Sequence, residues 1–146
     1  MKIVFFSLWL MVLGGCGDSP FLKEGKAPEN PVAQAEGLGL GLVFNDLKIT
    51  IRPYWRVGPR VGDECKLLIV LVDEAGTPLT DEIELELMLW MPSMGHGSFP
   101  ITTRKVGDGL YESTEIFFTM PGDWDVHFQI KDGENLLDEV KWSFIL

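Results

Sequence analysis

"DEIELELML", residues 81–89, decides the fold class, because apolar and polar side chains alternate strictly along it. Alternation with a period of two places one set of side chains on each face of an extended strand. We therefore predict a β-strand with one face in a core and the other in water. The inward positions are Ile83, Leu85, Leu87 and Leu89, and the outward positions are Glu82, Glu84 and Glu86.

The rest of the chain contains six more short segments with strand-like patterns, separated by turn signals such as Gly107-Asp108-Gly109. No segment keeps a helical period over three turns. Regularly spaced short strands with such turns are typical of a two-sheet sandwich. We predict an all-β fold, an immunoglobulin-like antiparallel β-sandwich of about seven strands. The six segments are residues 47–55, 65–73, 98–106, 110–120, 124–132 and 136–146.

The N-terminus has the features of a lipoprotein signal peptide. Lys2 precedes an apolar run, residues 3–13, that is too short to span a bilayer and has the length of a signal-peptide core. The run ends in Leu13-Gly14-Gly15-Cys16, which resembles the lipobox of bacterial lipoproteins. This resemblance implies that residues 1–15 are removed and that Cys16 is acylated and held in a membrane by its lipid.

Residues 16–42 are rich in Pro, Gly, Ala and Glu and lack sustained periodicity, which predicts a flexible linker. The folded domain is expected over residues 43–146. We expect the protein in the bacterial cell envelope, lipid-anchored on the periplasmic face. Gly17 follows Cys16 in place of the Asp that retains lipoproteins in the inner membrane, so the outer membrane is favoured.

Cys65 is the second of the two cysteines in the chain. With Cys16 acylated, it has no partner for an intrachain disulfide. It lies in an apolar strand-like segment, where an unpaired cysteine most often packs as a small hydrophobic residue. We predict a core position for it.

The net charge of −10 excludes one class of partner. Nucleic-acid binding depends on clustered Lys and Arg side chains, and this chain has no basic patch. We therefore expect no nucleic-acid partner. The same acidity opposes docking on anionic lipid head groups, so the membrane contact is expected through the lipid on Cys16.

The sequence lacks the common catalytic motifs, including the Gly-x-Ser-x-Gly elbow, the phosphate-binding loop, the Cys-x-x-Cys pair and His-Glu-x-x-His. Gly95-His96-Gly97-Ser98 superficially resembles a hydrolase oxyanion loop. No nucleophile elbow accompanies it, and no acidic partner is evident for a catalytic histidine. We expect a protein that is not an enzyme.

The segment "MPSMGHGS", residues 91–98, places thioether and imidazole side chains in a loop between two predicted strands. Thioether sulfur is a soft ligand that suits Cu(I), and imidazole suits both Cu(I) and Cu(II). Calcium and magnesium prefer oxygen ligands, and zinc generally takes Cys, His or carboxylate. We predict a copper site, with Cu(I) favoured. The candidate ligands are Met94, His96, Met91 and Met120.

Structural roles compete with metal binding at several of these positions. Met91 continues the inward parity of residues 83–89 and could cap the core. Met120 follows two phenylalanines and could fill the core instead of binding metal. His127 shares an outward face with polar neighbours, and we interpret it as a solvated surface residue.

A protein-contact surface is the alternative to a metal site. Trp90 has outward parity on its strand, and Phe99 follows the loop closely. Trp55 is also expected to be exposed. Methionine and aromatic side chains together suit an adaptable apolar surface for an envelope protein partner.

Two segments together resemble the YtkA-like domain, which is related to the FixH type of small extracytoplasmic β-sandwich. They are "MPSMGHGSFP", residues 91–100, and "VGDGLYESTEIFFTMPGDWDVHFQI", residues 106–130. The similarity extends over residues 57–145. It implies an immunoglobulin-like sandwich in the bacterial envelope, with family members linked to copper handling or to cytochrome oxidase assembly.

Carried over by position, the resemblance matches Met91, Met94 and His96 to the family's Met/His loop and Met120 to the methionine before Pro-Gly-x-Trp. The chain differs from FixH-type proteins by a lipid anchor in place of a transmembrane helix. We favour a lipid-anchored copper-binding protein that holds Cu(I) or passes it to a partner protein. The alternative is a metal-free envelope interaction module, including a role in respiratory oxidase assembly.

Overall fold

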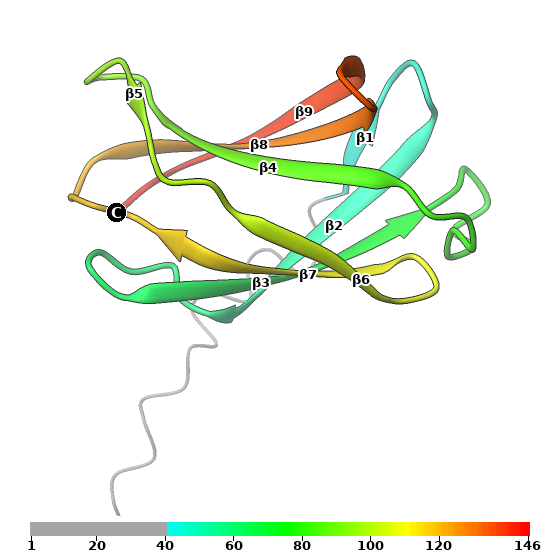
Figure 1. Cartoon of the computed structure of the whole chain (residues 1–146), viewed down its shortest axis with the longest axis horizontal. Coiled ribbons are helices and arrows are strands. Elements are labelled where there is room, and N and C mark those ends of the chain that lie inside the picture. The colour runs from blue at the N-terminus through cyan, green and yellow to red at the C-terminus, as the bar shows by residue number, and fades with distance from the viewer. Residues whose placement is uncertain (1–40) are drawn as a thin grey trace, which may run out of the picture. The chain divides into compact units, whose positions relative to one another are not determined.

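The computed structural model describes residues 41–146, which form nine β-strands in two antiparallel sheets (Figure 1). The predicted signal peptide, Cys16 and the linker up to residue 40 lie outside the described residues. Residues 41–146 contain no helix that is long and apolar enough to cross a membrane.

The five-stranded sheet has the order β1-β2-β3-β7-β6 and the four-stranded sheet the order β5-β4-β8-β9. All pairings within both sheets are antiparallel. The first sheet comprises β1 (Leu42–Phe44), β2 (Ile49–Val57), β3 (Glu64–Val72), β6 (Thr102–Gly107) and β7 (Leu110–Phe117). The second comprises β4 (Glu84–Met91), β5 (His96–Gly97), β8 (Asp123–Asp132) and β9 (Asn135–Ile145).

This strand order is that of an immunoglobulin constant-type sandwich. Strands β2, β3, β7 and β6 take the places of the A, B, E and D strands, and β4, β8 and β9 take those of C, F and G. The chain crosses between the sheets after β3, after β5 and after β7, which is Greek-key connectivity. The predicted fold class is confirmed.

Each of the seven predicted segments contains a strand, and the structure adds two short ones. Strand β1 pairs with β2 across the predicted boundary between linker and domain. Strand β5 has two residues and pairs with the end of β4. Both are too short to show an alternating pattern, so pairing with a longer neighbour is what makes them strands.

The core lies between the two sheets, and its residues on β4 follow the alternating pattern of residues 81–89. On β4, Leu85, Leu87 and Leu89 are buried, whereas the intervening side chains are exposed. Strand β8 supplies Trp124, Val126, Phe128 and Ile130 from the same sheet. Burying one such aliphatic or aromatic side chain contributes about 1.5–3 kcal/mol.

Aromatic side chains join the two sheets at one end of the core. Trp55 on β2 packs 5.8 Å, centroid to centroid, from Phe118 and from Trp142 on β9. Phe144 completes the cluster, 5.5 Å from Phe118. The expectation that Trp55 is exposed was therefore wrong. Trp55 shares the inward parity of the buried Ile51 and Pro53, and its ring lies against the opposite sheet.

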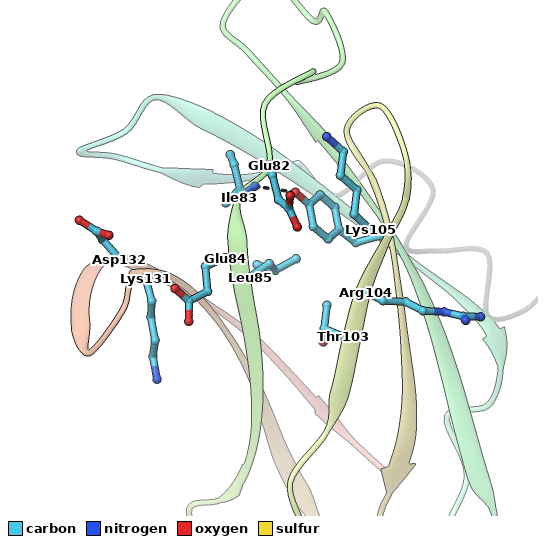
Figure 2. A pocket seen from close by; sticks show the side chains of 10 residues that line it. Glu82, Ile83, Glu84, Leu85, Thr103, Arg104, Lys105, Lys131 and Asp132 are labelled. Carbon is cyan, nitrogen blue, oxygen red and sulfur yellow. Dashed lines mark hydrogen bonds between the residues drawn. The ribbon is translucent and has the colours of Figure 1, made fainter.

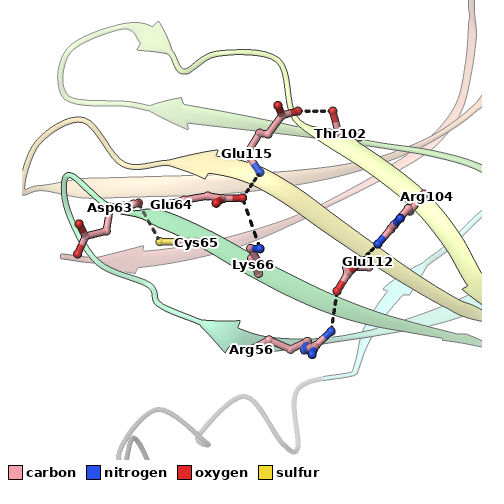
Figure 3. A network of polar contacts seen from close by, with 9 residues as sticks. All are labelled: Arg56, Asp63, Glu64, Cys65, Lys66, Thr102, Arg104, Glu112 and Glu115. Carbon is pink, nitrogen blue, oxygen red and sulfur yellow. Dashed lines mark hydrogen bonds and ion pairs between the residues drawn. The ribbon is translucent and has the colours of Figure 1, made fainter. Parts of the chain in front are cut away.

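The outer face of the five-stranded sheet carries a network of charged side chains (Figure 3). At its centre, Glu112 on β7 accepts hydrogen bonds from Arg56 (2.6 Å) and Arg104 (2.7 Å). The bond from Arg104 is the largest influence and outweighs burial, so the pKa of Glu112 is lowered. Cys65 on β3 lies on the other, inner face and is fully buried, as predicted.

Candidate functional site

The Met/His loop is a tight turn that closes the β4–β5 hairpin. The carbonyl of Met91 accepts hydrogen bonds from the backbone N–H groups of Met94 (3.2 Å) and Gly95 (2.9 Å). Gly95 has a φ of 67°, a left-handed conformation that glycine adopts without steric cost. This turn sets the register in which Met91 pairs with His96.

Met91 and His96 are directly opposite each other, so their side chains project to the same face of the hairpin. That face is the inner one, because Met91 is 4% exposed. The imidazole of His96 is half-buried and lies edge-on to the buried indole of Trp124, with 6.5 Å between ring centroids. The sequence prediction that Met91 belongs to the inward set is confirmed.

Trp124 also holds Met120 in this corner of the sandwich. The indole Nε1–H of Trp124 donates a 3.0 Å hydrogen bond to the carbonyl of Met120, and the Met120 side chain packs against the core. Gly122, in the same loop, is so close to Met91 that an added Cβ would lie 2.4 Å from the Met91 methyl. Three of the four candidate ligands thus gather around Trp124.

Met94 is placed differently from the other three. It occupies the tip of the turn and is 59% exposed. The next residue back, Ser93, donates its backbone N–H to Asp123 at 3.1 Å, which ties the turn to the start of β8. Hydrogen bonding by Ser93 lowers the pKa of Asp123 despite partial burial, so this carboxylate stays charged near the loop.

The side chains in this corner suit a soft metal ion. The His96 Nδ1 lies 3.2 Å from the carbonyl of Gly97. With the hydrogen on Nδ1, that bond forms and leaves the Nε2 lone pair available to a metal. Residues 41–146 hold no group of three His, Cys, Asp or Glu that could bind a metal. A hard-metal or zinc-like cluster is therefore absent from the described residues, and the thioethers provide the remaining ligand chemistry.

Comparison with known proteins identifies the family. The YtkA-like family matches residues 45–129 of the chain. The chain belongs to the YtkA-like family. No curated protein matches it.

Two solved structures are similar to this YtkA-like chain at low identity. A DUF4785 family protein from Legionella pneumophila subsp. pneumophila str. Philadelphia 1 is 13% identical, with a TM-score of 0.43. That match covers 68% of this chain and 28% of the Legionella chain, so this chain spans under a third of that protein. The ZirS C-terminal domain is 10% identical, with a TM-score of 0.36, and the match covers 97% of this chain and 86% of that one.

The aromatic residues predicted for a contact surface are exposed in this YtkA-like domain. Phe99 is 69% exposed and Trp90 is 36% exposed. Trp90 is paired with Gly97 across the hairpin, and its ring would lie 3.7 Å from a Cβ added there. That is an ordinary van der Waals distance, and the tight approach at Gly97 is instead to the Leu89 carbonyl oxygen, 2.9 Å from the added Cβ.

His127 faces outward, as predicted, but it is not a solvated residue. Its side chain is 16% exposed, and Nδ1 lies 3.0 Å from a carboxylate oxygen of Glu139. The β8 strand lies between β4 and β9, so neighbouring side chains on both sides cover the ring. Parity along one strand predicts the face of a residue but not its coverage by the adjacent strands.

A groove of about 770 Å³ lies at the other end of β4, where residues 82–85 face residues 103–105 across the gap between β4 and β6 (Figure 2). Several of its polar groups already form hydrogen bonds. Lys105 donates to the carbonyls of Thr80 (2.6 Å) and Asp81 (3.2 Å), and the Tyr111 hydroxyl accepts from the Ile83 N–H. These bonds tie the start of β4 to β6 and β7.

Sequence analysis missed the part that Trp124 and Gly122 play in this corner. Trp124 is fully buried. Both residues lie in the Met-Pro-Gly-x-Trp segment, residues 120–124, so the signal was present in the sequence. What it did not reveal is that this segment packs against the end of β4.

Proposed function

We propose that this YtkA-like protein is a non-enzymatic, lipid-anchored copper-binding protein of the bacterial envelope that holds Cu(I) or passes it to a partner protein. The observation that supports this most directly is the register of the β4–β5 hairpin. It places Met91 opposite His96 beside Trp124, to which Met120 is hydrogen-bonded. Side chains with soft donor atoms, from the β4–β5 hairpin and from the loop before β8, thereby lie at one corner of the sandwich.

In this proposal the four candidate ligands have different tasks. His96 and Met120 are half-buried and would hold the ion against the indole of Trp124. Met91 has its methyl against Gly122, so it would contribute only from the core side. Met94, exposed at the tip, would meet the ion first and would be the first ligand exchanged for one of the partner's.

The site suits transfer better than permanent storage. A half-exposed imidazole and an exposed thioether leave one side of the ion open to an incoming ligand. An incoming thioether or imidazole could then bind before the resident ligands leave. The extracytoplasmic location follows from the lipobox-like segment ending at Cys16, which lies outside the described residues.

The test is a Cu(I) competition titration against a chromophoric chelator. It uses the full chain in detergent with Cys16→Ser, so that this thiol does not bind the metal. We expect Met94→Leu/His96→Gln to lose one equivalent of Cu(I), whereas the exposed aromatic variant Phe99→Ala keeps it. Unchanged binding in the Met94/His96 variant would overturn the proposal.

The exposure of Met94, Trp90 and Phe99 favours a second candidate function, a metal-free interaction module. Here the outer edge of the β4–β5 hairpin would contact an envelope protein through apolar area. A photo-crosslinking residue at position 99, used in intact membranes, tests it. A metal-free module gives the same discrete adduct with and without a copper chelator, and Trp90→Ala weakens it.

A further inference from the structure

The outer face of the four-stranded sheet holds a second methionine–histidine pair. His127 lies on the inner strand β8, and Met88 on β4 is directly opposite it. Side chains at directly opposed positions share a face, with Cβ atoms about 4.5–5.5 Å apart. Trp90, two residues after Met88, is on the same face and is a diagonal neighbour of His127.

The imidazole of His127 is held in one orientation from the β9 side. Its Nδ1 lies 3.0 Å from Glu139 Oε1, and the other oxygen of Glu139 accepts a 2.5 Å hydrogen bond from Gln129. Burial opposes ionisation of Glu139, but the bonds from Gln129 and His127 outweigh it and lower its pKa. The charged carboxylate therefore accepts the Nδ1–H bond, which places the imidazole lone pair on Nε2.

The Nε2 atom has no hydrogen-bond partner among residues 41–146 and is buried. A buried polar atom without a partner costs about 1–3 kcal/mol. A carboxylate on one ring nitrogen and a free lone pair on the other is the arrangement found in metal-binding histidines. Met88, the residue opposite His127, is 39% exposed.

The charges around His127 are compatible with a bound monovalent cation. Lys141, opposite His127 on β9, is 3.0 Å from Asp125. Burial of Asp125 opposes its ionisation, but bonds from Ser143 and Lys141 outweigh it and lower its pKa, so Asp125 neutralises the lysine. The carboxylate of Glu139 is then left to balance one further positive charge.

We propose that Met88 and His127 form a second soft-metal site for Cu(I), with the Met88 sulfur and His127 Nε2 as ligands and the indole face of Trp90 beside the ion. Thioether and imidazole select a soft monovalent ion over zinc or calcium. An aromatic face adds cation–π attraction. The site shares no ligand with the Met/His loop and does not depend on the function proposed for it.

The experiment titrates Ag(I), a redox-inert substitute for Cu(I), into the full chain with Cys16→Ser, in detergent, by calorimetry. We expect the Met88→Leu/His127→Gln variant to bind one equivalent of Ag(I) less than the parent. The Met94→Leu/His96→Gln variant should still bind Ag(I) at the Met88/His127 site. Glutamine at position 127 retains a donor for Glu139. Equal stoichiometry in the parent and the Met88/His127 variant would overturn this inference, and equal stoichiometry in the Met94/His96 variant would overturn the proposed function.

A second measurement needs no substitution at the site and so does not depend on the folding of a variant. In the NMR spectrum of the same parent chain, one equivalent or more of Ag(I) should shift the ring protons of His127 and the Met88 methyl. If the chemical shifts of the His127 ring protons do not change up to saturation with Ag(I), the inference is overturned.

Discussion

At the scale of single residues, methionines on one hairpin have three distinct environments. Met91 is buried at the end of β4, Met94 is exposed at the turn, and Met88 lies on the outer face. Thioethers at these depths differ in what they can do, because a buried one is confined by packing and an exposed one can exchange partners. Composition alone groups them as one set of ligands, whereas burial separates them.

The ion pairs of Glu112 with Arg56 and Arg104 predict that the stability of the domain depends on pH. Glu112 is buried between Arg56 and Arg104, and its pKa is lowered from the ordinary 4.5 (Figure 3). A carboxylate with a lowered folded-state pKa stabilises the fold above its unfolded pKa, and this contribution is lost as pH falls through the folded value. We expect Glu112→Gln to lower the urea midpoint at pH 7, with the difference from the parent narrowing below pH 4.5.

The control is Glu74→Gln, which breaks an ion pair between two exposed side chains, Lys48 and Glu74, 3.7 Å apart. Exposed pairs contribute little, so this variant should keep the parent midpoint at every pH. If the urea midpoint of Glu112→Gln lies below that of the parent by the same amount from pH 7 to below pH 4.5, the lost interaction is not ionic.

At the scale of elements, two hairpins have glycines with the same backbone conformation and different surroundings. Gly109, between β6 and β7, has a φ of 59°, and Gly133, between β8 and β9, has a φ of 62°. A Cβ on Gly109 would lie 2.5 Å from the Leu71 carbonyl oxygen and 2.8 Å from the Leu79 nitrogen, whereas a Cβ on Gly133 would have no atom within 4 Å. The β6–β7 hairpin is thus packed against the backbone at the end of β3 and of the segment after it.

This contrast predicts unequal costs for the same substitution. Gly133→Ala should lower the free energy of unfolding by about 1–2 kcal/mol, the cost of a left-handed conformation alone. Gly109→Ala should cost about 3 kcal/mol or more, because the backbone of Leu71 must also move. Urea unfolding of the two variants measures the difference. Equal losses would mean that the close approach at Gly109 is relieved without cost.

At the scale of the whole domain, the two sheets are joined by a core in which aromatic residues from both meet. Trp55 of the five-stranded sheet contacts Trp142 and Phe144 of the four-stranded sheet. Strand β1 also lies beside β9, which connects the sheets along another edge. The corner that holds the candidate site is built on this same core through Trp124 and Phe118. The candidate site is therefore held by the fold and not by its own loop alone.

Cys65 reports on the integrity of this core. It is fully buried on β3, and burial raises the pKa of its thiol. In the chain with Cys16→Ser, we expect a thiol reagent such as dithionitrobenzoate to leave Cys65 unmodified in buffer and to label it at the rate of unfolding in urea. Rapid labelling without denaturant would show that the sandwich opens locally around β3.

Much of the fold was accessible from local pattern. The alternation in residues 81–89 predicted β4, its inward leucines and the buried position of Met91, and the spacing of turns predicted a sandwich. Alternation carries this information because side chains on a strand point to opposite faces in turn. The resemblance of residues 91–100 and 106–130 to the YtkA-like domain also agrees with the family match.

Other features arose only when strands distant in sequence came together. Pairing placed His96 opposite Met91 and turned a two-residue segment into β5. Packing against aromatic residues of the other sheet left Trp55 half-buried, and flanking strands covered His127 while leaving its Nε2 without a partner among the described residues. A single strand's pattern fixes which face a side chain takes, because that depends on its own backbone. Its neighbours across the sheet and the core depend on long-range contacts, so register and burial were decided by the tertiary structure.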